Sequence, residues 1–151
     1  MRTVSRTLIA ISVLTVSVLA QPKPNFSGRW VITSPADSAG QEQIVTQDAK
    51  TLTVEHASEG GGHKMSYQLD GVERRMAIPG RAGAEITMLA KASWDGNTIV
   101  VLTNTSYPNG MKTPSKDVWS IDAKGQLVID TTESGNGAQA PAVKMIHVKK
   151  K

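Results

Sequence analysis

The chain has 151 residues, no cysteine, 17 basic and 13 acidic side chains, and only three Trp, two Tyr and one Phe. A chain of this length forms one domain, with a core large enough to fold without disulfide bonds or a structural metal. So few aromatic residues exclude the interleaved basic and stacking surface of a nucleic-acid-binding protein.

The first 20 residues have the pattern of a secretory signal peptide. Arg2 and Arg6 give a positive start, residues 8–19 form a run of apolar and small residues, and small residues precede Gln21. The alternative is a membrane anchor, but a run of about 12 residues is shorter than the about 20 that cross a hydrocarbon core. We therefore expect cleavage before Gln21 and an exported protein, periplasmic or extracellular, with no integral membrane segment after cleavage.

The rest of the chain is nearly neutral. Two of the 17 basic residues and none of the 13 acidic ones lie in the predicted signal peptide, so the remainder carries a formal charge of +2. Lysines at 149–151 supply much of the basic character. This tail either contacts anionic surfaces or is a solvated end that keeps the last strand from aggregating. We expect no nucleic-acid partner.

After an extended leader at 21–24 with two prolines, the chain alternates short apolar runs with turn residues. The clearest period-2 alternation, which is typical of half-buried strands, covers residues 51–57, 63–69 and 84–94. Residues 73–79 form a more polar and weaker strand. No segment has sustained helical periodicity, so we predict about eight to nine strands.

These strands predict an all-β fold over residues 25–149. Turn signals such as Asp70-Gly71 separate nearly all neighbouring strands. The pattern favours a single antiparallel up-and-down (meander) β-barrel. A two-sheet sandwich is the alternative, because turns alone do not show closure.

The first strand begins with Asn-Phe-Ser-Gly-Arg-Trp at residues 25–30. We expect Gly28 to let the backbone pass close to other backbone, and the indole of Trp30 to plug the end of the barrel. Both roles are structural.

This start, together with the Trp-Asp-Gly-Asn turn at residues 94–97, resembles the lipocalin-like (calycin) barrels, and most closely small secreted bacterial lipocalin-like proteins. Lipocalins proper stack an arginine on the tryptophan and carry a C-terminal helix. This chain has no arginine after Arg81 and no sequence for that helix. Lys144 or Lys149 would take the place of the arginine. Avidin-type barrels share the Gly-x-Trp start and are a further possibility.

The resemblance implies that the barrel binds a small, largely apolar molecule. The candidate wall residues are large side chains on the apolar phases of the strands, namely Leu52, Val54, Met65, Tyr67, Met88, Trp119 or its neighbour Val118, Leu127 and Met145. The alternative is that these side chains simply fill the barrel. The protein would then be a non-enzymatic interaction or structural module.

A second hypothesis concerns a pair of histidines. If the glycine-rich loop between them closes a hairpin, His56 faces His63 with Cβ atoms roughly 5 Å apart, close enough to share a divalent metal. The candidate third ligands are His147, Glu55 and Glu59. The alternative is that these histidines are polar residues at the rim of the barrel.

Motifs of catalysis are absent from the sequence. It has no cysteine nucleophile, no Gly-x-Ser-x-Gly elbow, no His-Glu-x-x-His helix and no phosphate-binding loop. We therefore expect a non-enzymatic protein without catalytic residues or a cofactor.

Overall fold

The computed structural model describes residues 22–56, 62–79, 85–135 and 138–151. The predicted signal peptide and Glu59 lie outside these residues. Within them, no helix has both the length and the apolar character needed to cross a membrane.

The described chain is almost entirely β-strand, with one 3-10 helix, η1 (Ala36–Ser38). The strands are β1 (Gly28–Ser34), β2 (Glu42–Gln47), β3 (Thr51–His56), β4 (Lys64–Gln68), β5 (Arg74–Pro79), β6 (Glu85–Asp95), β7 (Thr98–Ser106), β8 (Lys112–Ile121), β9 (Leu127–Gly135), β10 (Ala138–Gln139) and β11 (Val143–Lys149).

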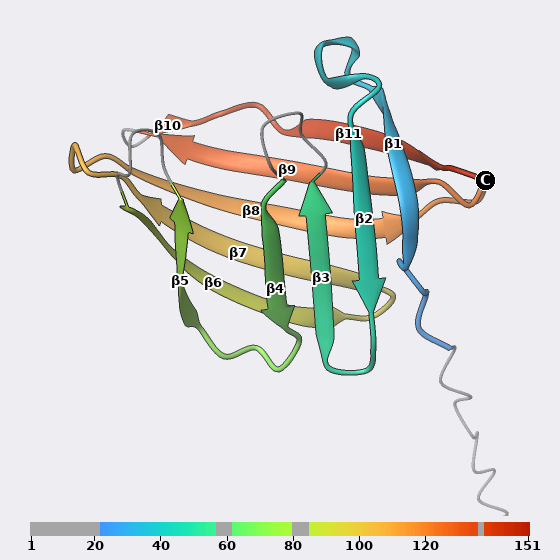
Figure 1. Cartoon of the computed structure of the whole chain (residues 1–151), viewed down its shortest axis with the longest axis horizontal. Helices are drawn as coiled ribbons and strands as arrows, with labels where there is room; N and C mark the ends of the chain where they lie inside the picture. Colours follow the sequence, from blue (N-terminus) through green and yellow to red (C-terminus); the bar gives the residue numbers. More distant parts are fainter. Residues whose placement is uncertain (1–21, 57–61, 80–84, 136–137) are drawn as a thin grey trace, which may run out of the picture.

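Ten of these strands form one continuous antiparallel path in the order β4-β3-β2-β1-β11-β9-β8-β7-β6-β5, and the short β10 pairs with β9. The first and last strands are joined, with Val31 of β1 opposite Val148 of β11. Figure 1 shows the sheet curled into a half-barrel, with β2 to β5 crossing in front of the longer strands β6 to β9. The predicted all-β antiparallel fold is confirmed. The count is ten strands rather than eight to nine, and the weak stretch at 73–79 forms a complete strand, because β5 pairs along its whole length with β6.

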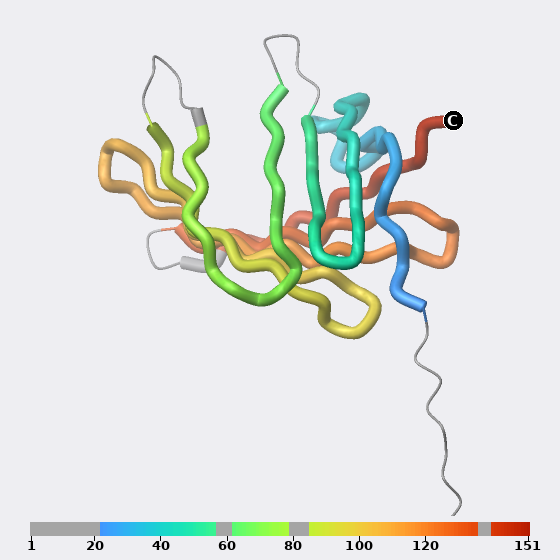
Figure 2. Tube along the Cα trace, turned by 60° about the horizontal axis from the view of Figure 1, so that its bottom comes forward, coloured from blue at the N-terminus to red at the C-terminus, as the bar shows by residue number. Residues whose placement is uncertain are grey.

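The sequence pattern predicted a closed barrel, but the barrel is open on one side. In the described part of the chain, no ladder pairs β4 with β5, which are the two ends of the path. Asp70 bridges to Ser93 of β6, and the Gly71 N–H donates a 2.9 Å hydrogen bond to the carbonyl of Ala92. The sheet therefore meets itself near this turn, and β4 and β5 diverge from it (Figure 2).

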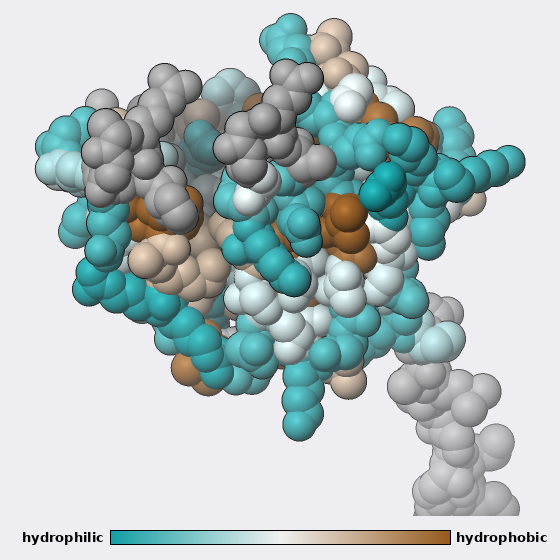
Figure 3. All heavy atoms as spheres, in the orientation of Figure 1, coloured by the Kyte–Doolittle hydropathy of each residue, from teal (hydrophilic) through white to brown (hydrophobic). Residues whose placement is uncertain are grey.

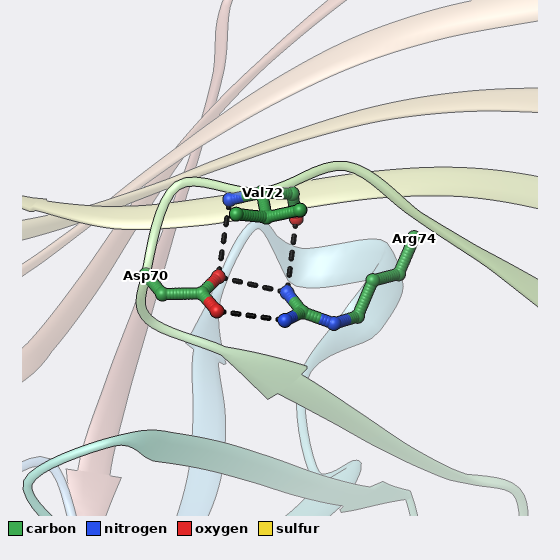
Figure 4. Close-up of polar contacts among 3 residues, drawn as sticks. All are labelled: Asp70, Val72 and Arg74. Carbon is green, nitrogen blue, oxygen red and sulfur yellow. Dashed lines mark hydrogen bonds and ion pairs between the residues drawn. The ribbon is translucent and has the colours of Figure 1, made fainter.

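A cluster of polar contacts holds the turn at the base of this opening (Figure 4). Two guanidinium nitrogens of Arg74 donate to the two carboxylate oxygens of Asp70, each over 2.7 Å. The Val72 N–H donates to the same carboxylate over 3.0 Å. The hydrogen bonds from Arg74 and then from Val72 hold the pKa of Asp70 well below its usual range. The turn is thus fixed where the two strands separate.

Aromatic residues plug the half-barrel where β1 begins. Phe26 is fully buried, and its ring centre lies 6.0 Å from that of Trp94 and 6.4 Å from that of Trp119. The indole N–H of Trp30 donates a 2.9 Å hydrogen bond to the Phe26 carbonyl. Lys149 Nζ lies 5.5 Å from the centre of the Trp30 ring, in a cation–π contact. Of the two lysines considered for this position, Lys149 is the one that lies over the Trp30 ring.

Lys144, the other candidate to stack on Trp30, and Lys150 of the lysine tail have different partners. Lys144 forms an ion pair with Asp130 over 3.6 Å. Lys150 donates a hydrogen bond to the carboxylate of Glu42. The tail therefore contacts the fold at two lysines, 149 and 150.

The structure corrects the predicted role of Gly28. Its φ of 155° favours glycine, but a Cβ added there would lie 2.5 Å from Cε of Lys149 rather than against backbone. The reason is the register of the first and last strands, which sets Lys149 opposite Trp30 and lays its side chain across Gly28. The close approach is thus between backbone and a flexible side chain.

Candidate functional site

A cavity of about 180 Å³ lies inside the half-barrel, beside the aromatic core. Its wall receives residues from η1, the loop after it and eight strands. The apolar part of the wall is formed by Ile32, Val54, Met65, Val101, Ile129 and Met145.

Strand alternation positions this wall. In β3 and β4 every second side chain points inward, and the register sets Val54 opposite Met65 and Leu52 opposite Tyr67. Five of the eight predicted wall residues line the cavity, namely Val54, Met65, Tyr67, Trp119 and Met145. The other three, Leu52, Met88 and Leu127, are buried in the aromatic and aliphatic core instead, and Val118 does not line the cavity. Part of the interior is therefore filled and part is open.

The wall also contains polar residues that the sequence analysis did not single out. Gln43 and Asp117 line the cavity, with Ser38 and Gln41. The same alternation that places Val45 and Trp119 inward also places Gln43 and Asp117 inward. This signal was present in the sequence, but the wall was predicted from apolar residues alone.

Two buried donors on the wall are unpaired. Gln43 is 3% exposed and Trp119 is 5% exposed. The Gln43 side-chain Nε2 and the Trp119 indole Nε1 have no hydrogen-bond partner among the described residues. Buried polar groups are normally paired, and both residues line the cavity, so an acceptor atom of a ligand is one way to satisfy these donors.

Asp117 is the acidic group of the described wall. Its carboxylate accepts a 2.8 Å hydrogen bond from Thr131 Oγ1. Burial raises the pKa of Asp117, while the hydrogen bond from Thr131 acts in the opposite direction. Burial, and then the nearby charge of Asp117, raises the pKa of Tyr67 to about 12, so this phenol is neutral at physiological pH.

His147 is almost completely buried at 1% exposure, with Nδ1 3.4 Å from the Leu127 carbonyl oxygen. Burial lowers the pKa of His147, and it also lowers the pKa of His56, which lines the same cavity. Both imidazoles are therefore held toward the neutral form.

The predicted pairing of His56 with His63 is confirmed. The His56 N–H donates a 3.1 Å hydrogen bond to the His63 carbonyl, and the two rings stack with centres 4.8 Å apart. Among the described residues, no group of three or more His, Cys, Asp or Glu could hold a metal ion. Glu55 is exposed on the opposite phase of β3. A metal bound by the two histidines stays a hypothesis, without a third ligand in the described chain.

The chain matches no protein-family model and no curated protein. A solved structure of similar fold is the REP1-NXSQ fatty acid transporter, at a TM-score of 0.57 and 12% sequence identity, over 83% of this chain and 96% of that chain. At this identity the likeness concerns the fold alone. With the curled antiparallel half-barrel, it fits the calycin-like fold that residues 25–30 implied.

Proposed function

We propose that this protein binds a small, largely apolar molecule in the cavity of the half-barrel. The observation that carries the proposal is a cavity of about 180 Å³ whose wall combines apolar side chains with a few polar groups. This combination is typical of small-molecule sites, where apolar surface supplies affinity and polar groups set orientation. The similar fold of a fatty acid transporter agrees with this function.

The size of the cavity limits the ligand. A volume of about 180 Å³ is below the roughly 300–1,000 Å³ of drug-sized pockets, but on the order of the about 150 Å³ that holds one benzene ring. The cavity therefore accepts a ring-sized molecule or one segment of a longer one. Met65 and Met145 can adapt their shape to different guests.

The cavity lies next to the open side of the sheet, between β4 and β5. Tyr67 lines both the cavity and a small pocket whose other residues include Met76 of β5 and Ala90 of β6. Tyr67 thus lies between the cavity and the open side of the sheet. The face in Figure 3 is mostly hydrophilic, with hydrophobic atoms in separate patches among polar ones, as suits a protein that holds its guest inside.

We also propose that the protein is exported and acts in the periplasm or outside the cell, and that it is not an enzyme. The pattern of residues 1–20 supports export, and the lack of catalytic motifs supports the second statement.

Native mass spectrometry of residues 21–151, purified from an exporting host, tests the binding function. The mass is compared before and after organic extraction, and after incubation with lipids, retinoids and haem. We expect a guest that extraction releases or that the panel supplies. Val54→Phe, which fills the cavity, should reduce its capture, whereas Val118→Phe, outside the cavity, should not. A wild-type protein that stays bare throughout would contradict the proposal and favour an interaction module.

A further inference from the structure

The polar groups of the cavity wall carry information about the head group of the ligand. The Gln43 Nε2 and Trp119 Nε1 donors are buried and unpaired among the described residues. A buried donor without a partner is unfavourable, and an acceptor atom brought in by a ligand relieves that cost. The wall therefore has two donors, either of which an acceptor atom of a ligand would satisfy.

Asp117 favours a ligand that donates a hydrogen bond, whereas Gln43 and Trp119 favour one that accepts a hydrogen bond. An ionised carboxylate only accepts hydrogen bonds, and its two oxygens have about four acceptor positions. Thr131 Oγ1 donates a 2.8 Å hydrogen bond to this carboxylate and the Ser115 side chain donates another, so about two acceptor positions are left for a ligand. A ligand that brings an O–H donor can therefore bond to Asp117, whereas a ligand carboxylate would meet a like charge.

No cation on the described wall offsets that repulsion. The 14 described residues that line the cavity include neither lysine nor arginine. The two histidines among them, His56 and His147, have pKa values lowered by burial, which favours their neutral forms. A fatty acid anion would therefore lie beside Asp117 without a charged partner from these residues.

We propose that the cavity selects an uncharged, hydroxyl-bearing apolar molecule, whose oxygen accepts from Trp119 or Gln43 and whose O–H donates to Asp117. This inference rests on the proposed binding function and names the ligand class. This ligand preference would differ from that of the fatty acid transporter of similar fold.

Displacement of a bound fluorescent apolar probe by three compounds with an eight-carbon chain tests the proposal at pH 8. The compounds are 1-octanol, its methyl ether and octanoate. We expect 1-octanol to bind at least about tenfold more tightly than octanoate and several-fold more tightly than the ether. The ether retains the acceptor but lacks the O–H, and its extra methyl group would make it the better ligand of a purely apolar cavity.

An ether that binds as tightly as the alcohol, or an octanoate that binds more tightly, would overturn the selectivity while leaving the binding function intact. A wild-type protein that binds neither the probe nor any of the three compounds would overturn both. The two failures are thus distinguishable.

Variants test whether the wall residues cause the preference for the alcohol. Asp117→Leu should abolish the preference for alcohol over ether, whereas Asp130→Leu, which removes a carboxylate paired with Lys144 outside the cavity, should keep it. If Asp117→Leu does not fold, Trp119→Phe keeps an aromatic ring, removes the donor and should weaken alcohol binding several-fold. An unchanged preference in the folded variants would contradict the assignment.

Discussion

The indole N–H of Trp30 donates a 2.9 Å hydrogen bond to the backbone carbonyl of Phe26, four residues earlier in the chain. This bond fixes the path by which the chain enters β1, and it holds the fully buried Phe26 ring against Trp94 and Trp119. Trp119 is also part of the cavity wall. The plug at one end of the half-barrel is therefore continuous with the candidate binding site.

Replacing Trp30 with Phe should lower the free energy of unfolding by about 2–4 kcal/mol, because it leaves the buried Phe26 carbonyl unpaired and opens a small void. Urea denaturation followed by circular dichroism measures this change. A loss below about 0.5 kcal/mol would show that the hydrogen bond does not anchor the plug.

Replacing Lys149 with Met should lower the free energy of unfolding by less than Trp30→Phe does. The variant keeps a chain of similar length across Gly28 but removes the charge over the Trp30 ring, so the expected loss is about 0.5–1 kcal/mol. The same denaturation measurement applies. Lys144→Met is the matched control, since Lys144 forms an exposed ion pair with Asp130 and should change stability by less. An equal effect of both variants would argue against a specific cation–π contact.

The turn between β4 and β5 should respond to acid. The pKa of Asp70 is lowered in the folded state by hydrogen bonds from Arg74 and Val72. Its contribution to stability is therefore complete above the unfolded pKa of about 3.9 and is lost as the pH falls toward the folded value. Asp70→Asn should reduce the dependence of stability on pH below about 4. A variant whose stability falls as steeply as that of the wild type would contradict this role.

His147 should make stability depend on pH in a higher range. Burial lowers its pKa in the folded state, so the unfolded chain binds a proton first as the pH falls. The stabilisation is complete above the unfolded pKa of about 6.5 and is lost as the pH falls from there toward the folded value. Urea midpoints at pH 7.5 and 5 should differ less in His147→Gln than in the wild type. An undiminished difference would assign the effect to other groups.

The sequence predicted most of the strands because their alternation reflects burial on one face. Leu52 and Val54 of β3, and Met65 and Tyr67 of β4, face inward as their spacing indicated. The open side was not predictable, because it depends on the pairing of β5 with β6 and the lack of a β4–β5 ladder, which local patterns do not encode.

The polar part of the site was missed for a different reason. Gln43 and Asp117 occupy inward positions in β2 and β8, but polar residues at such positions look like breaks in an apolar pattern. Only the assembled wall shows that these residues line one space with Trp119. The sequence pattern also did not show where β8 begins. This strand starts at Lys112, before the apolar residues of its second half.

The most direct test of ligand binding in the cavity is a titration of the ¹⁵N-labelled protein with 1-octanol, followed through the indole N–H resonances. The Trp119 N–H is unpaired among the described residues, whereas the Trp30 N–H is bonded to Phe26. We predict a saturable shift of the Trp119 resonance while the Trp30 resonance stays in place. A Trp119 resonance that does not move at any octanol concentration would contradict binding in this cavity.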